Sequence, residues 1–184
     1  DKVDGLTYHM YYAFNDETTM GVNDSIKRLN DVISSIEKSG YANKLKLHLT
    51  EFGLSIYNSG YTGPSLYDSG QALHFARMMN RLYSYNQIET AQYFMGCFLM
   101  IDLVKDDPVM TSSPIRKMLN EYLTKARGKV VETKVSNDLE WHNGVVTAAT
   151  FKTDDGIRLF VTNTSDTPQN VSFEGRHTYT VKST

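Results

Sequence analysis

The stretch that decides the fold is Leu45-Lys46-Leu47-His48-Leu49-Thr50-Glu51-Phe52-Gly53. Its apolar and β-prone residues predict a buried strand over 45–50, with Glu51 at the carboxyl end of that strand. A carboxylate at the end of a buried strand is costly to desolvate and contributes little to folding. Glu51 is therefore either an ordinary strand-end glutamate, satisfied by water or a lysine, or a group that carries chemistry.

Strand-like and helix-like segments alternate along the chain up to Arg127. Apolar and aromatic runs predict three strands, over residues 5–12, 45–50 and 93–103, the third of them buried on both faces. Apolar residues at helical spacing predict three helices: one that ends at Gly40, one that begins after Asp68 and one from Ser113-Pro114 to Gly128. This order, βαβαβα, is typical of a parallel sheet with helical crossovers.

Beyond Gly128 the predicted elements are short strands. They cover residues 129–135, 145–151, 157–162, 169–173 and 178–181, and Asp155-Gly156 predicts a hairpin turn. We therefore expect an α/β domain over 1–127 and a small antiparallel β domain, a sandwich, over 128–184. Trp141 is assigned to the core of that second domain rather than to a sugar-binding surface.

The composition narrows the range of partners. The chain of 184 residues has a formal net charge of -2, so it offers no basic surface for a nucleic acid. No apolar stretch reaches membrane-spanning length, and we expect no membrane partner. The sequence has no Cys/His cluster, no calcium-loop pattern and no glycine-rich phosphate loop. We therefore expect neither a metal nor another cofactor.

Three polar side chains are predicted to meet at the ends of the first two strands. Because side chains alternate along a strand, His9 and Tyr11 share one face, opposite Tyr8, Met10 and Tyr12. Glu51 lies at the end of the next parallel strand, where barrel enzymes carry their chemistry. A tyrosine hydroxyl or an imidazole that is hydrogen-bonded to a carboxylate keeps it ionised and oriented, as a nucleophile requires.

These residues resemble the retaining glycoside hydrolases of the (β/α)8-barrel superfamily, which includes cellulases, mannanases, β-xylosidases and α-L-arabinofuranosidases. Residues 4–12, with their His-x-Tyr ending, are similar to the sixth barrel strand of that superfamily. Residues 47–53 are similar to the seventh strand, whose glutamate is the nucleophile, and 92–102 would form the eighth. The resemblance implies the C-terminal part of a TIM barrel followed by a β-sandwich, a carbohydrate substrate, and Glu51 as the catalytic nucleophile.

Two further segments could contribute to such a pocket. Tyr57 and Tyr61 belong to the loop that follows the Glu51 strand, where they could stack on sugar rings or simply pack within the loop. Asp102 is either a second pocket carboxylate or a strand-end aspartate that binds a backbone amide. Retaining hydrolysis needs an acid/base as well as a nucleophile. In the superfamily the acid/base follows the fourth strand, which would precede Asp1, so we expect this chain alone to be inactive.

Two functions from different classes follow from this pattern. One is a glycoside hydrolase, secreted or periplasmic, in which this chain carries the nucleophile. The other is a non-catalytic carbohydrate-binding or assembly module, in which the β domain is functional and the partial barrel is a scaffold. Three parallel strands do not close into a barrel. We therefore expect the open edges to pair with a missing N-terminal barrel half or, as the alternative, with a second copy of the chain.

Overall fold

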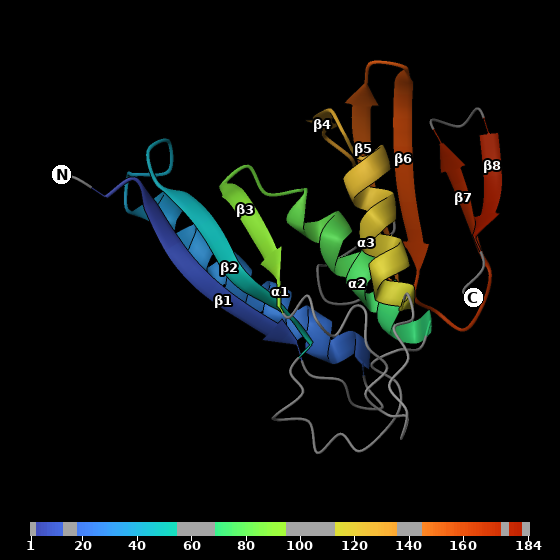
Figure 1. The fold of residues 1–184 in the computed structure, drawn as a ribbon, viewed down its shortest axis with the longest axis horizontal. Helices are drawn as coiled ribbons and strands as arrows, with labels where there is room; N and C mark the ends of the chain where they lie inside the picture. Colours follow the sequence, from blue (N-terminus) through green and yellow to red (C-terminus); the bar gives the residue numbers. More distant parts are fainter. Residues whose placement is uncertain are drawn as a thin grey trace.

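The computed structural model describes residues 3–12, 18–54, 69–94, 113–135, 145–173 and 177–181. Strands and helices alternate in its first part: β1 (Gly5–Tyr12), α1 (Thr18–Lys38), β2 (Lys46–Leu54), α2 (Ser69–Leu82), β3 (Ile88–Tyr93) and α3 (Pro114–Lys125) (Figure 1). Strands alone follow: β4 (Lys129–Val131), β5 (Val146–Thr153), β6 (Gly156–Asn163), β7 (Gln169–Phe173) and β8 (His177–Val181).

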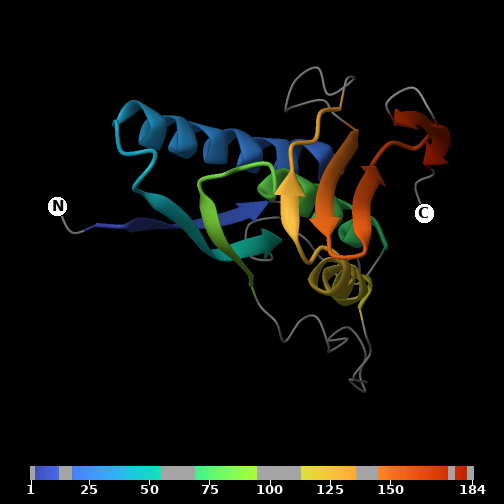
Figure 2. The same ribbon diagram turned by 90° about the horizontal axis from the view of Figure 1, so that it is seen from above.

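The first three strands form one sheet in the order β1-β2-β3, and both neighbouring pairs are parallel. The helix α1 runs along one face of this sheet (Figure 2). This arrangement confirms the predicted α/β class and the predicted parallel pairing of β1 with β2. Within the described residues β2 is the central strand, so β1 and β3 each have one edge without a strand partner there.

The core lies between the sheet and its helices. The apolar stripe of α1 is buried at Ile26, Leu29, Ile33 and Ile36, as the helical spacing predicts. The α2 helix buries a second stripe, which consists of Ala72, Phe75, Ala76, Met79 and Leu82. Both stripes belong to one hydrophobic cluster with the sheet residues Met10, Tyr12, Leu47, Leu49 and Phe52. The opposite face of the sheet therefore carries the polar side chains of β1 and β2.

The third strand differs from its prediction. It begins at Ile88 rather than Tyr93 and ends at Tyr93, and residues 95–103 of the predicted strand lie outside the described residues. In the observed strand, residues 89–92 are exposed. The predicted strand, in contrast, is the apolar run over 93–103 and is expected to be buried on both faces. Polar residues are compatible with this position because β3 has no neighbour on its outer side within the described residues. An edge strand does not require a continuous apolar sequence.

The helix α3 begins as predicted and ends earlier than predicted. Ser113 is its N-cap, with the side-chain oxygen accepting a hydrogen bond from the Arg116 backbone N–H at 3.1 Å. It ends at Lys125, and Ala126 is the C-cap. Gly128, which the sequence predicts as the end of this helix, lies beyond it. A glycine is needed there because a Cβ would lie 2.2 Å from the Lys152 carbonyl oxygen. That close approach brings the chain beside β5, where β4 begins.

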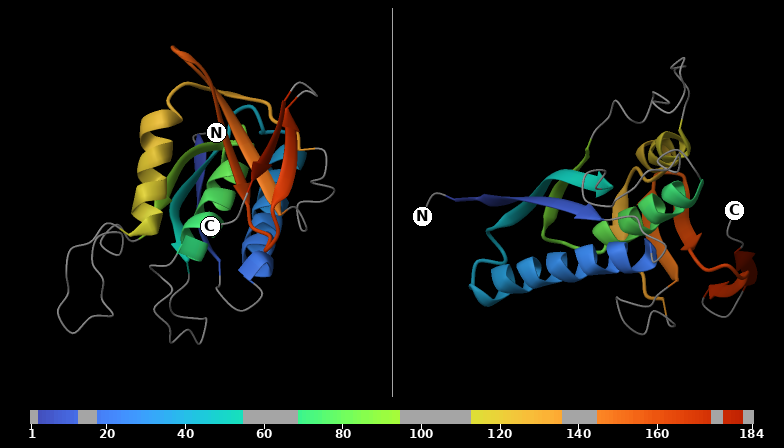
Figure 3. Two further views of the ribbon diagram at one scale, coloured as in Figure 1. Left: turned by 90° about the vertical axis from the view of Figure 1, so that its right-hand side faces the viewer. Right: turned by 90° about the horizontal axis from the view of Figure 1, so that it is seen from below.

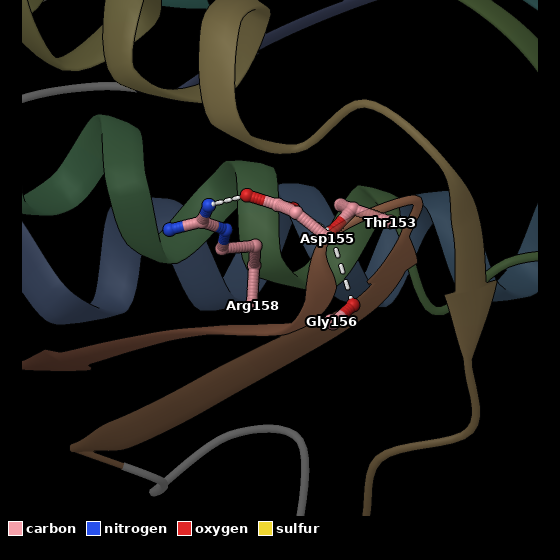
Figure 4. A network of polar contacts seen from close by, with 4 residues as sticks. All are labelled: Thr153, Asp155, Gly156 and Arg158. Carbon is pink, nitrogen blue, oxygen red and sulfur yellow. Dashed lines mark hydrogen bonds and ion pairs between the residues drawn. The ribbon is translucent and has the colours of Figure 1, made fainter.

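The remaining strands form two antiparallel sheets, one in the order β4-β5-β6 and one of β7 with β8. The hairpin predicted at Asp155-Gly156 is confirmed, because Thr153 at the end of β5 pairs with Gly156 at the start of β6. Figure 4 shows how polar contacts hold this turn: the Thr153 hydroxyl donates to the Gly156 carbonyl at 2.9 Å, and Arg158 pairs with Asp155. The sandwich stays a prediction, and Trp141 is not among the described residues.

The antiparallel sheet β4-β5-β6 packs against α2 (Figure 3). Two aromatic contacts join the two parts of the chain: Tyr122 stacks on Phe160 with ring centroids 4.4 Å apart, and Tyr83 meets Phe151 edge-on at 4.8 Å. The predicted boundary between residues 127 and 128 therefore falls within a shared aromatic core. The division of the chain into two domains at this boundary stays a prediction.

Candidate active site

A local irregularity of β2 determines the direction of Glu51. Tyr8 pairs with Leu49, but the next residue of β1, His9, pairs with Glu51, so Thr50 is an extra residue in β2. Strict alternation would place Glu51 on the same face as the buried Leu49. The extra residue shifts the alternation by one, as a β-bulge does, and Phe52 enters the core instead, with 1% of its surface exposed.

Both predicted partners from β1 contact the Glu51 carboxylate. The Tyr11 hydroxyl donates a hydrogen bond to Oε2, and Nδ1 of His9 lies 3.3 Å from the same oxygen. The side chain of Glu51 is 30% exposed and that of His9 is 55% exposed. In the described part of the chain, no lysine or arginine pairs with Glu51, and its Oε1 has no hydrogen-bond partner. The described residues thus contact one oxygen of the carboxylate and leave the other without a hydrogen-bond partner among them.

Tyr11 is a hydrogen-bond donor over the whole physiological pH range. Loss of solvation raises the pKa of Tyr11 to about 12, and the hydrogen bond to Glu51 and the negative charge of that carboxylate add to the effect. The neutral Tyr11 hydroxyl therefore fixes the position of one oxygen of the Glu51 carboxylate.

Phe94 forms a third side of the site, and sequence analysis did not identify it. Its ring meets the ring of Tyr11 edge-on, with centroids 5.9 Å apart and planes at 88°. Phe94 directly follows β3, so it occupies the end of the third strand just as Glu51 lies near the end of the second. The sequence signal for Phe94 is an aromatic residue at a strand end, but the apolar run over 93–103 predicts a strand that begins later than β3 and places Phe94 near its start.

Comparison with known proteins rests on structure alone, because the sequence matches no protein-family model and no curated protein. The crystal structure of an alpha-L-arabinofuranosidase from Thermotoga maritima, an arabinose complex, matches with a TM-score of 0.69 and 20% identity, over 91% of this chain and 39% of that chain. A second arabinofuranosidase structure matches with a TM-score of 0.57 and 20% identity, over 86% of this chain and 37% of that one.

The chain has a glycoside hydrolase-like fold. At 20% identity the likeness establishes the fold. The chain spans less than two fifths of the length of either matching structure, 39% of one and 37% of the other. The fold predicted from the resemblance is thus supported at the level of an α/β glycoside hydrolase-like arrangement.

The three remaining predicted site residues, Tyr57, Tyr61 and Asp102, all lie outside the described residues. Within those residues no second carboxylate contacts the side chains of the site, and no group of three or more His, Cys, Asp and Glu side chains could hold a metal ion. No helix in the described part of the chain is long and apolar enough to cross a membrane.

The glycoside hydrolases that the sequence resembles carry their acid/base glutamate directly after an asparagine, and this sequence contains one such pair, Asn120-Glu121. It lies inside α3 rather than at a strand end. There Glu121 pairs with Lys125 one helical turn further along, on a largely exposed surface. This pair therefore does not provide the acid/base of the candidate site.

Proposed function

We propose that this chain is the nucleophile-bearing part of a retaining glycoside hydrolase that acts on a poly- or oligosaccharide. One observation carries the proposal: Tyr11 and His9 converge on a single oxygen of Glu51 at the carboxyl ends of two parallel strands. The glycoside hydrolase-like fold supports it. A surface glutamate of purely structural use would be expected to pair with a cation or with water. This one is instead contacted by the Tyr11 hydroxyl and by Nδ1 of His9, both from the neighbouring strand.

The proposed reaction uses the oxygen of Glu51 that has no partner in the described residues. Oε1 attacks the anomeric carbon of the sugar, the bond from that carbon to the leaving oxygen breaks, and a glycosyl ester of Glu51 forms. The leaving oxygen takes a proton from a separate acid, which then acts as a base and activates the water that hydrolyses the ester. During attack, Tyr11 and His9 keep Oε2 in place so that Oε1 faces the sugar.

The acid/base must come from a second carboxyl group, about 5–5.5 Å from the first in retaining enzymes. We propose that it belongs to an N-terminal barrel half, which also closes the sheet against β1 and β3. Two grooves support this. One, of about 400 Å³, lies between α1 and the first residues of β1 and is lined by residues that include Leu6, Val32, Ile36 and Leu45. The groove beside β3, of about 750 Å³, is lined by residues that include Leu82, Tyr83, Ile88, Leu119 and Leu123.

Substitution of the nucleophile tests this proposal in the full-length protein. Glu51→Gln keeps the shape of the side chain and removes the charge needed for attack, so kcat should fall by several powers of ten while sugar binding persists. Glu121→Gln is the matched control, because the Glu121 carboxylate pairs with Lys125 on the surface of α3, away from the candidate site. It should leave kcat unchanged. Equal hydrolysis by the Glu51→Gln variant and the parent protein would exclude Glu51 as the nucleophile.

A non-catalytic carbohydrate-binding or assembly module remains the second candidate. It is favoured by the lack of a second carboxylate at the site within the described residues. The two candidates predict different results for one assay on the full-length protein. The enzyme releases a sugar whose anomeric configuration is retained, as NMR of the first product can detect, whereas the binding module retains an oligosaccharide without hydrolysing it.

A further inference from the structure

The ring of Tyr11 is held in place by a residue two strands away. Tyr11 pairs with Gly53 across β1 and β2, and Phe94 follows the last residue of β3. Neighbouring strands are about 4.8 Å apart, so residues on β1 and β3 are separated by roughly twice that distance. The two rings nevertheless meet, with centroids 5.9 Å apart. Gly53, the partner of Tyr11 on β2, lies on the strand between them and leaves room for the end of β3 to approach.

Gly53 also controls how closely Phe94 can approach the central strand. A Cβ at position 53 would lie 2.7 Å from the Phe94 carbonyl oxygen, closer than real Cβ contacts allow, and 3.4 Å from the Tyr93 ring. Its φ of +158° is also one that residues with a side chain rarely adopt. Any other residue at this position would therefore push the end of β3 away from β2.

The backbone of Phe94 is held by a residue of the core. Its backbone N–H donates to the Phe52 carbonyl at 2.9 Å, and the buried Phe52 ring stacks on Phe75 of α2 at 6.2 Å. On the other side of the site, the Ser25 hydroxyl of α1 donates to the Tyr11 carbonyl at 2.9 Å. The backbone of Tyr11 is thus attached to α1, and its ring is restrained by Phe94.

We propose that Gly53 and Phe94 act together as positioning residues, which fix the Tyr11 ring so that its hydroxyl stays on Glu51. Phe94 acts through Tyr11 by its edge-on contact, and Gly53 acts through Phe94 by leaving room for it. The consequence for turnover rests on the proposed glycoside hydrolase function. The effect on the position of the Tyr11 ring does not depend on that function, because the contact between the two rings is present whatever reaction the protein catalyses. A half-exposed aromatic residue that merely packs would affect stability without changing the environment of the Tyr11 hydroxyl.

The test compares Phe94→Leu, Phe94→Tyr and the parent in the full-length protein. Tyrosine labelled with 13C at Cζ reports the ionisation of each phenol by NMR, and the Tyr11 signal is identified by its loss in Tyr11→Phe. In Phe94→Leu, water should reach the Tyr11 hydroxyl, so its pKa should fall from about 12 toward 10. In the same variant kcat should fall about tenfold with little change in KM. Phe94→Tyr retains the ring and should restore both values.

Gly53→Ala provides the second arm. It should reproduce the effects of Phe94→Leu, and the double variant should be no worse than either single variant, because both substitutions break the same contact. If Phe94→Leu does not fold, Phe94→Met replaces it, since methionine is a flexible side chain that adapts to aromatic-sized space. An unchanged Tyr11 titration and unchanged kcat in the folded Phe94 variant would overturn the inference. If the parent protein has no hydrolase activity, the proposed function fails and the NMR titration still decides this inference.

Discussion

The Tyr11 hydroxyl donates a hydrogen bond to Oε2 of Glu51, across two neighbouring parallel strands and 40 positions apart in the sequence. The contact depends on an irregular register, because the extra residue Thr50 turns Glu51 away from the core and toward Tyr11. It also depends on Gly53, which lets Phe94 reach the Tyr11 ring. The candidate site is therefore a product of backbone geometry as much as of side-chain chemistry.

Removal of Thr50 should leave Glu51 on the open face of the sheet. In the deletion variant Glu51 directly follows the buried Leu49, so strict alternation places Glu51 on the open side and Phe52 in the core, as in the parent. Chemical denaturation should therefore detect only a moderate change in the free energy of unfolding. Thr50→Ser keeps the residue count and is the control, and it should unfold at nearly the same denaturant concentration as the parent. A loss in the deletion variant of about 3–5 kcal/mol, the size expected for a buried, unpaired carboxylate, would contradict the assigned register.

Tyr11→Phe should reduce turnover without abolishing it. The substitution removes one hydrogen bond to a charged acceptor, worth about 1.5–3 kcal/mol, which corresponds to a fall in kcat of roughly 10- to 150-fold. Steady-state kinetics on the full-length protein measures this effect. Tyr8→Phe on the opposite face of β1 is the matched control and should leave kcat unchanged. A similar loss in both variants would indicate a general effect of the strand rather than the contact with Glu51.

The sequence predicted the elements whose signals are local. Aromatic residues after Gly5 predicted β1 with its observed bounds, and Ser113-Pro114 predicted the start of α3, because capping depends on a few adjacent residues. The side chains of His9 and Tyr11 were also placed on the correct face, since β1 alternates regularly. Regular local geometry thus accounts for most of the correct predictions.

The direction of Glu51 and the role of Phe94 depend on contacts between strands, which no local pattern records. Alternation along β2 predicts the wrong face for Glu51, because an extra residue in one strand is visible only when its partner is known. The role of Phe94 is not predicted for a related reason. The apolar run after Phe94 predicts a buried strand, whereas the observed strand β3 consists largely of exposed, polar residues before it. The loop tyrosines and Asp102 stay predictions.

Asn80 should be the most sensitive polar residue of the shared core. Its amide donates to the Thr147 carbonyl at 3.3 Å and to the Thr162 hydroxyl at 3.3 Å, and its carbonyl oxygen accepts from Tyr122 at 2.6 Å. In Asn80→Leu these buried groups lose their hydrogen-bond partner, and each unsatisfied group destabilises the fold by about 1–3 kcal/mol. The free energy of unfolding should fall by several kcal/mol, measured by urea denaturation.

The control for Asn80 is Asn120→Leu on the exposed surface of α3, which should change the free energy of unfolding by less than about 0.5 kcal/mol. The unfolding of the parent should also be a single transition, because the network joins α2 and α3 to β5 and β6. Two separate transitions, or an Asn80→Leu variant as stable as the Asn120→Leu variant, would contradict the shared core.

The protein should lose stability at alkaline pH. Burial raises the pKa of Tyr93 to about 12, whereas the unfolded chain ionises this phenol from about pH 10. The contribution of the neutral phenol is therefore complete below pH 10 and is lost as the pH rises to about 12, at up to about 3 kcal/mol. Urea denaturation at pH 9 and pH 11.5 measures the loss. Tyr93→Phe should lose less over this range, and an equal loss in the two proteins would contradict the assigned burial of Tyr93.

The central claim is that Glu51 forms a covalent bond with the sugar, and mass spectrometry of a trapped intermediate tests it most directly. A 2-deoxy-2-fluoroglycoside with a good leaving group needs no acid to depart, so it tests the nucleophile separately from the acid/base. After incubation of the full-length protein with this reagent and digestion, the account predicts a fluoroglycosyl ester on the peptide that contains Glu51, and no ester in Glu51→Gln. An ester on a different carboxylate, with Glu51 unmodified, would contradict the account.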